Sequence, residues 1–312
     1  MDNKVIVIVG PTASGKTSLS IEIAKRFNGE IISADSMQIY KYMDIATAKP
    51  TAEEMQGIKH HLIDFLSPCE KFSVAKYKEL CYGCIDDIIE RNKLPIIVGG
   101  TGLYIDTVVN NTVFLEGDSS DIRNTLEKNC EENGIESLYE KLKEIDPQSA
   151  EKLHLSDKKR IIRALEVYYS TGKTISEQNR LSHTEKSKYD FLIIGLNAND
   201  REFLYNRINS RVDLMIESGL IEEARKFYDS DFSLTAVQAI GYKELKPYLD
   251  GFCSLDEAKE KLKMETRRYA KRQLTWFRRN KDINWIYIDN SEDVFDKSVE
   301  IIENFGVNTD GK

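Results

Sequence analysis

Long apolar runs are absent from this sequence of 312 residues. No stretch reaches the roughly 18 apolar residues that a membrane-spanning helix requires, so we expect no membrane span. The opening residues, MDNKVIVIVG, contain neither a cationic segment nor a small-residue cleavage site, which argues against a secretion signal. The five cysteines are an odd number without a disulfide framework. Together these absences predict a cytoplasmic protein, kept in a reducing environment.

Positive charge is also scarce overall, because the formal net charge is −8. Taken alone, this balance argues against a nucleic-acid partner. The distribution is uneven, however, since ten Lys or Arg and only two Glu lie between Lys259 and Lys281. Tyr269, Trp276 and Phe277 stand among these cations, and we expect the last two in the core. The segment predicts a basic helix with a polyanionic partner, against the alternative of an ordinary cationic face.

A glycine-rich motif follows the first apolar run. GPTASGKT at residues 10–17 fits G-x-x-x-x-G-K-[ST] at every position, with a predicted strand before it and a predicted helix after it. In that context backbone amides and the positive end of the helix hold phosphate oxygens, Lys16 adds a charge, and the Thr17 hydroxyl can bind Mg²⁺. The predicted phosphate-binding residues are Gly10, Pro11, Thr12, Ala13, Ser14, Gly15, Lys16 and Thr17.

The fold class is predicted from five short apolar runs, KVIVIV, EIIS, LPIIVGG, FLIIGL and WIYI, which helical patterns mostly separate. Such a pattern is typical of a parallel α/β sheet with helices on both faces. Residues 113–184 differ, because they are charged, helical in period and without a convincing strand. We therefore predict a P-loop core in two parts, 1–112 and 185–312, and a helical insertion domain, 113–184. Residues 200–228 predict one long helix, with Arg207 and Arg211 on one face.

Polar residues follow two further strands of the predicted sheet. Asp35 comes after EIIS and Thr101 after LPIIV, and sites in open α/β sheets form beyond the carboxyl ends of strands. We therefore expect Lys16, Asp35 and Thr101 in one site. The alternatives are a helix cap for Asp35 and a turn residue for Thr101.

An aspartate is missing where a nucleotide-hydrolysing protein would use one to bind its metal. The strand LPIIV ends in Gly99, Gly100 and Thr101 instead. The glycines allow close approach of backbone and substrate, and Thr101 offers a neutral hydroxyl. This arrangement favours orientation of a leaving oxygen over the metal site of an ATPase.

With these residues in place, the chain resembles the bacterial tRNA dimethylallyltransferases, also called tRNA isopentenyltransferases, over nearly its whole length. The motifs that carry the resemblance are GPTASGKT, ISADSMQIY, DIATAKP, HHLID, VGGTGLYI, KRIIRALEV, QAIGYKE and RRYAKRQLTWFRR, in that order. The resemblance implies transfer of a dimethylallyl group from dimethylallyl diphosphate to the exocyclic amine of the adenosine just 3′ of the anticodon. It implies that diphosphate leaves, with Mg²⁺ as the cofactor.

The resemblance also implies roles for individual residues. Asp35 would face the amine and Thr101 the bridging oxygen. Lys16 and Arg207 would hold the phosphates, with Arg211 as the alternative to Arg207. The segments that would contact the tRNA anticodon stem-loop include Asp35, Ser36, Met37, Gln38, Lys159, Arg160, Arg163, Gln238, Gly241, Tyr242, Lys243, Lys271 and Arg272. We expect the insertion to clamp the stem and the protein to be a monomer.

Three other functions share some of these features. A P-loop kinase of a nucleoside or small metabolite would explain the phosphate loop and Asp35, but not the basic helix or GGTGLY. A nucleic-acid-binding NTPase would explain the basic helix but needs the missing metal aspartate. An enzyme that prenylates free adenylate would explain the loop, but the helical insertion favours a macromolecular acceptor.

Overall fold

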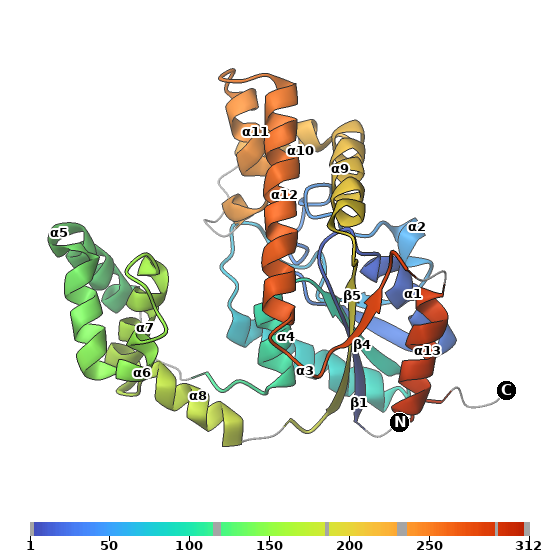
Figure 1. The fold of residues 1–312 in the computed structure, drawn as a ribbon, viewed down its shortest axis with the longest axis horizontal. Helices are drawn as coiled ribbons and strands as arrows, with labels where there is room; N and C mark the ends of the chain where they lie inside the picture. Colours follow the sequence, from blue (N-terminus) through green and yellow to red (C-terminus); the bar gives the residue numbers. More distant parts are fainter. Residues whose placement is uncertain (1–2, 115–119, 185–186, 230–235, 291–292, 309–312) are drawn as a thin grey trace. The chain divides into compact units, whose positions relative to one another are not determined.

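The computed structural model describes residues 3–114, 120–184, 187–229, 236–290 and 293–308 (Figure 1). The chain divides into two compact units. The first comprises Met1–Val108 and Lys188–Lys312, and the second comprises Val109–Ser187.

The first unit is built on a parallel sheet of six strands, in the order β3-β2-β4-β1-β5-β6. Its strands are β1 (Lys4–Val9), β2 (Gly29–Ser33), β3 (His60–His61), β4 (Leu94–Gly99), β5 (Asp190–Asn197) and β6 (Asn284–Tyr287). The predicted apolar runs form five of them, and β1 and β4 are buried almost throughout, as expected between two layers of helices. The sequence pattern does not predict β3, because two histidines form no apolar run; they pair with Ile31 and Ile32.

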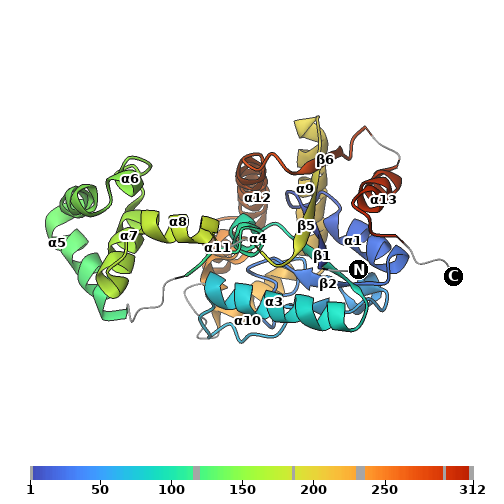
Figure 2. The ribbon, with the colours of Figure 1, turned by 90° about the horizontal axis from the view of Figure 1, so that it is seen from below.

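Helices cover both faces of this sheet (Figure 2). On one face, α1 (Lys16–Arg26) and α13 (Val294–Asn304) share a core with alternate residues of the strands. On the other face, α3 (Val74–Glu90) packs so that the Tyr77 hydroxyl donates to the carbonyl of Ser33 in β2 at 3.1 Å. Tyr104 of α4 (Gly102–Val109) stacks on Tyr77 with 4.0 Å between ring centroids. The predicted α/β fold is confirmed.

A group of helices follows β5 in the first unit and has its own apolar core. Its members are α9 (Arg201–Glu217), α10 (Leu220–Tyr228), the 3₁₀ turn η1 (Ala236–Gln238), α11 (Tyr242–Leu249) and α12 (Leu255–Phe277). The long helix predicted over residues 200–228 is wrong, because Gly219 has a φ of 100° and separates α9 from α10. The basic helix is confirmed as α12, which begins with a capping box between Ser254 and Glu257. The short α2 (Ala52–Met55) precedes β3.

The second unit is helical in its described residues. It contains α5 (Ser120–Ile145), α6 (Pro147–Ala150), α7 (Lys158–Thr171) and α8 (Ile175–Thr184), and α5 is kinked at Gly134. Leu138, Leu142 and Leu165 belong to a separate apolar core that joins α5 to α7. The predicted insertion, residues 113–184, lies inside this unit. In neither unit does the structure describe a helix with the length and apolar character to cross a membrane.

Candidate active site

The carboxyl ends of β2, β4 and β1, neighbours in the sheet, bring the three predicted catalytic residues to one edge. The ends of β2 and β4 approach closely, because a Cβ on Gly99 would lie 2.1 Å from the carbonyl oxygen of Ala34. The Thr101 hydroxyl accepts a hydrogen bond from the Ser36 amide at 3.0 Å and donates to Ser36 Oγ at 3.3 Å. Glycine at position 99 therefore lets Thr101 sit beside the Asp35–Ser36 turn.

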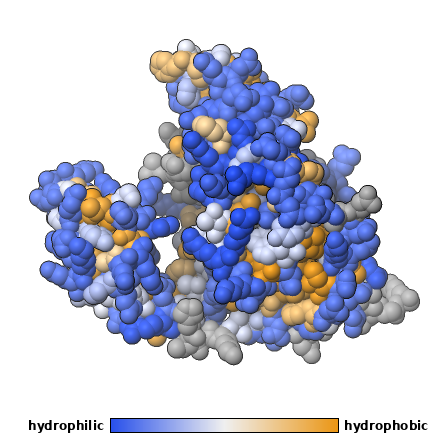
Figure 3. Space-filling view, in the orientation of Figure 1, coloured by the Kyte–Doolittle hydropathy of each residue, from blue (hydrophilic) through white to orange (hydrophobic). Residues whose placement is uncertain are grey.

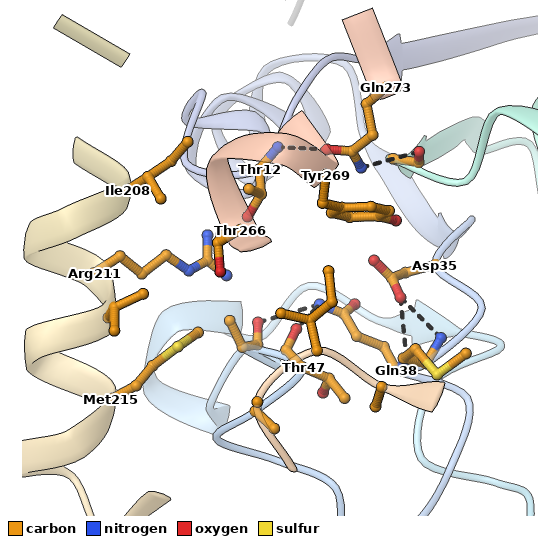
Figure 4. Close-up of a pocket in the computed structure, with 18 of the residues that line it drawn as sticks. Thr12, Asp35, Gln38, Thr47, Ile208, Arg211, Met215, Thr266, Tyr269 and Gln273 are labelled. Atoms are coloured by element: carbon orange, nitrogen blue, oxygen red, sulfur yellow. Dashed lines mark hydrogen bonds between the residues drawn. The ribbon is translucent and has the colours of Figure 1, made fainter. Parts of the chain in front are cut away.

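Asp35 uses its two carboxylate oxygens differently. Its Oδ1 accepts hydrogen bonds from the amides of Met37 at 2.9 Å and Gln38 at 3.3 Å, so the carboxylate does cap the turn. Its Oδ2 makes no hydrogen bond among the described residues, and the side chain lines a cavity (Figure 4). One carboxylate oxygen of Asp35 is thus held by the turn, and the other can bind a group in the cavity.

The P-loop connects β1 to α1 and is shaped for close contact with an anion. Ala13 and Gly15 have φ values of 62° and 88°, a backbone geometry that turns amides toward one side. Lys16 Nζ donates to the carbonyl of Pro11 at 2.7 Å. Burial, and then the nearby Arg211 guanidinium, lower the pKa of Lys16 to about 7, while Asp35 opposes the shift. A bound anion would stabilise the positive charges of Lys16 and Arg211 in this buried position.

The cavity beside these residues has a volume of about 330 Å³ and two kinds of wall. Its polar wall includes Thr12, Lys16, Thr17 and Asp35. Its apolar wall comes from α9 and its neighbours and is formed by Ile208, Val212, Met215, Leu220, Ile240 and Leu262. In Figure 4 the side chains of Ile208 and Met215 flank Arg211 and lie across the cavity from Asp35. A phosphate-binding loop and an apolar slot therefore belong to one cavity.

The two candidate arginines of α9 differ in their contacts. Arg207 Nε donates to the carbonyl of Ala13 at 2.8 Å, in a second groove that residues 13–17 of the P-loop line. Arg211, one turn later, points into the cavity toward Thr12 and also borders the groove (Figure 4). Both lie at the P-loop, and the choice between them for the diphosphate stays a prediction.

The structure adds Tyr269 and Gln273 of α12, which the sequence reasoning missed as site residues. Both line the cavity, four residues apart on the inner face of the basic helix. Burial raises the pKa of Tyr269, so that its hydroxyl remains protonated near Asp35. Gln273 contacts two segments of the site by hydrogen bonds. The sequence did contain one signal for these residues: they are uncharged and polar, and they lie one helical turn apart within a run of cations.

The predicted RNA-contacting residues fall into several places. Ser36, Met37, Gln38, Gly241, Lys243 and Arg272 line the cavity. Lys271 is exposed on α12, where strongly hydrophilic side chains gather (Figure 3). Lys159, Arg160 and Arg163 lie on α7 of the second unit, and the last two are at least half exposed. The side chain of Gln238 lies outside the described residues.

Tyr242 departs from the expected role. It is fully buried, stacks on Phe227 with 4.1 Å between ring centroids, and donates to Glu223 at 2.9 Å. Its side chain therefore has no surface for RNA and instead supports the helices around the cavity.

Comparison with known proteins identifies the family. The IPP transferase family model matches residues 38–280, and an isopentenyl transferase model matches residues 3–71. The chain belongs to the IPP transferase family. The tRNA dimethylallyltransferase of Acetivibrio thermocellus is 55% identical over 307 residues, which cover 97% of this chain and 96% of that relative. The tRNA dimethylallyltransferase of Halalkalibacterium halodurans is 50% identical over 98% of this chain and 97% of its own length.

Solved IPP transferases share the fold. The full-length tRNA isopentenylpyrophosphate transferase of Bacillus halodurans is 48% identical and superposes with a TM-score of 0.70, covering 97% of this chain and 95% of that one. A eukaryotic dimethylallyltransferase captured acting on tRNA is 33% identical, with a TM-score of 0.84, covering 99% and 81%. The resemblance inferred from the motifs is confirmed.

Proposed function

We propose that this IPP transferase moves the dimethylallyl group of dimethylallyl diphosphate to the exocyclic amine of the adenosine 3′-adjacent to the anticodon in tRNA, releasing diphosphate. One observation carries the proposal: a single cavity joins a phosphate-binding loop, the Asp35 carboxylate and an apolar wall. The loop suits the diphosphate. The wall suits a five-carbon group, whose burial is worth about 1.5–3 kcal/mol, as for an aliphatic side chain.

Asp35 acts during the attack in this proposal. The lone pair of the adenine amine is delocalised into the ring, and a carboxylate is too weak a base to remove the proton beforehand. As nitrogen bonds to the allylic carbon and the bond from that carbon to the diphosphate oxygen breaks, Oδ2 takes the amine proton. Lys16 and an arginine of α9 meet the charge that develops on diphosphate, and Thr101 contacts the bridging oxygen.

Mg²⁺ fits the oxygen donors at the P-loop. Thr17 lines the cavity beside Lys16, and no group of three or more His, Cys, Asp or Glu that could hold a metal occurs in the described part of the chain. Mg²⁺ typically keeps several waters and binds few protein groups together with substrate phosphates. Thr17 would hold the ion with the diphosphate, whose negative charge the ion would partly neutralise when bound.

The RNA partner is supported by α12. Its cations stand beside the cavity that contains Asp35, so phosphates of an RNA bound there would lie near the adenine-accepting site. The adenine must leave its stack to reach the cavity, which costs a few kcal/mol that backbone contacts offset. The second unit, with its exposed cations on α7, would clamp the anticodon stem. The protein acts as a cytoplasmic monomer in this proposal.

The test is mass spectrometry of anticodon-loop nucleosides after incubation of unmodified tRNA with the protein, Mg²⁺ and dimethylallyl diphosphate. We expect one adenosine to gain a dimethylallyl group. AMP in place of tRNA tests the enzyme that prenylates free adenylate. Modification of AMP but not of tRNA would contradict the proposal.

Diphosphate binding should depend on the protonation of Lys16. Because its pKa is lowered to about 7 and a bound anion raises it, binding takes up a proton above that pH, and affinity falls as pH rises. Titration calorimetry with inorganic diphosphate between about pH 6 and pH 9 measures this, since arginine stays charged over that range. In the Lys16→Arg variant the side chain stays charged, so any remaining pH dependence comes from the titration of diphosphate itself. Identical pH profiles for the wild type and this variant would refute the role of Lys16.

RNA binding should weaken steeply with salt, and α12 should carry part of that dependence. Replacing Lys271 and Arg272 with alanine should lower the slope of log Kd against log salt by about 0.7–0.9 for each RNA phosphate that the helix no longer binds. Filter binding at several salt concentrations measures the slope. The control is the pair Lys25→Ala and Arg26→Ala, two exposed cations at the far end of α1. An equal change in both variants would make α12 an ordinary cationic face.

A further inference from the structure

Gln273 connects two segments of the site that are far apart in the sequence. Its Nε2 donates to the carbonyl of Gly100 at 3.0 Å, and its Oε1 accepts from the amide of Thr12 at 2.9 Å (Figure 4). Gly100 directly precedes Thr101, and Thr12 belongs to the P-loop. Gln273 is only 6% exposed, so water does not readily replace either bond.

The amide is fitted to its place in both chemistry and shape. The Thr12 amide can only donate and the Gly100 carbonyl can only accept, so a side chain that does both is required, and its orientation is fixed by the partners. A Cβ on Gly100 would lie 2.1 Å from Nε2 of Gln273. Glycine at position 100 therefore provides the space in which the amide sits.

This bridge also affects which amides of the P-loop are available to bind phosphate. The Thr12 amide is committed to Gln273 and the Ser14 amide donates to the carbonyl of Pro11 at 3.4 Å, so the remaining amides of the loop are the ones left for phosphate oxygens. The other end of the bridge holds the end of β4, from which Thr101 reaches the Asp35–Ser36 turn. Gln273 thus adds a side-chain link between the phosphate-binding loop and the proton acceptor, beyond the pairing of Val9 in β1 with Gly99 in β4.

We infer that Gln273 is a positioning residue for the transfer step: its amide fixes the P-loop at Thr12 against the end of β4 at Gly100, and so helps to set the distance from the leaving diphosphate to Thr101 and Asp35. The inference rests on the proposed function. It assigns Gln273 no contact with either substrate. Its loss should therefore slow the chemical step more than it weakens binding.

The test compares single-turnover transfer with donor affinity in Gln273→Met, which keeps the length and apolar stem of the side chain but removes both bonds. Misplacement of reacting groups by about 1 Å can cost 100-fold, so we expect the rate at saturating tRNA and donor to fall by about 10- to 100-fold. The dissociation constant for dimethylallyl diphosphate should change less than about threefold. Gln273→Glu, which keeps an acceptor for Thr12 but loses the donor to Gly100, is a second variant. Thr275→Ala, exposed on the same helix, should transfer at the wild-type rate.

A pair of alanine variants tests the fit between Gly100 and Gln273. Gly100→Ala should slow transfer because its Cβ displaces the amide. Once Gln273 is alanine that collision is gone, so the double variant should be no slower than Gln273→Ala alone. If the rate losses of Gly100→Ala and Gln273→Ala multiply in the double variant, the inference is overturned, as it is by a wild-type rate in Gln273→Met. An inactive wild-type protein would instead overturn the proposed function, and this inference with it.

Discussion

Replacing Asp35 with asparagine is expected to slow transfer by about 100-fold or more, the contribution typical of a general base. Asparagine still accepts hydrogen bonds from Met37 and Gln38, so the turn should be preserved. It has no oxygen that can take the amine proton. Single-turnover transfer measures the loss, and the affinity for tRNA, measured in parallel, should stay near that of the wild type.

The matched control is Asp64→Asn. Asp64 is an exposed carboxylate near the same turn and pairs with Lys49 at 2.6 Å, outside the cavity. Its replacement should leave the transfer rate unchanged. If Asp35→Asn retains nearly full turnover, Asp35 is a turn cap only and its catalytic assignment is wrong.

Replacing Glu30 with glutamine is expected to lower the free energy of unfolding by about 2–3 kcal/mol. Glu30, only 3% exposed in its side chain, accepts hydrogen bonds from Arg91, Lys93 and His61. The amide leaves Lys93 without the charge of Glu30 and Arg91 with only the exposed Asp87 as a countercharge. The expected loss is smaller than for a fully buried ion pair, because Arg91 and Lys93 are each 35% exposed. The site lies beside β3, away from the cavity, so transfer at low temperature should be retained.

Urea unfolding followed by tryptophan fluorescence measures this effect, because both tryptophans, Trp276 and Trp285, lie in the first unit. The hydrogen bond from Arg91, the largest of several causes, lowers the pKa of Glu30 in the folded protein. The stabilisation of the fold by ionised Glu30 is therefore complete above the pKa of a glutamate in the unfolded chain, about 4.3, and is lost as the pH falls below that value. The difference between wild type and variant should therefore shrink in acid. Asp87→Asn removes an exposed partner of Arg91 and should lower stability far less than Glu30→Gln does, because water screens that pair. Equal losses in both variants would contradict the assigned role of Glu30.

The sequence predicts the parts of this site that depend on local pattern. Continuous apolar runs identify β1, β2 and β4, and the glycine-rich motif identifies the P-loop because its geometry is encoded in consecutive residues. The rule that sites form beyond the carboxyl ends of parallel strands then brings Asp35 and Thr101 to the same edge. These inferences need only a parallel sheet and no knowledge of side-chain packing.

Other features depend on tertiary contacts and could not be predicted. Gln273 stands among cations and looks like a surface residue until α12 packs against Gly100. Tyr242 lies in a segment that resembles an RNA-contacting motif, but its burial against Phe227 is decided by the packing of α10 on α11. The break at Gly219 replaces one predicted helix with two, because a glycine within a helical pattern can either continue the helix or end it.

Diphosphate release from dimethylallyl diphosphate tests most directly whether the P-loop serves a prenyl donor. The reaction contains the protein, Mg²⁺ and the donor, with and without unmodified tRNA, beside a parallel reaction with ATP. The P-loop accepts phosphate oxygens from either compound, so weak ATP binding is expected, and the apolar wall of the cavity must select the donor. We predict diphosphate release that requires tRNA while ATP remains intact. Rapid ATP turnover with an inert prenyl donor would contradict this function and favour the P-loop kinase.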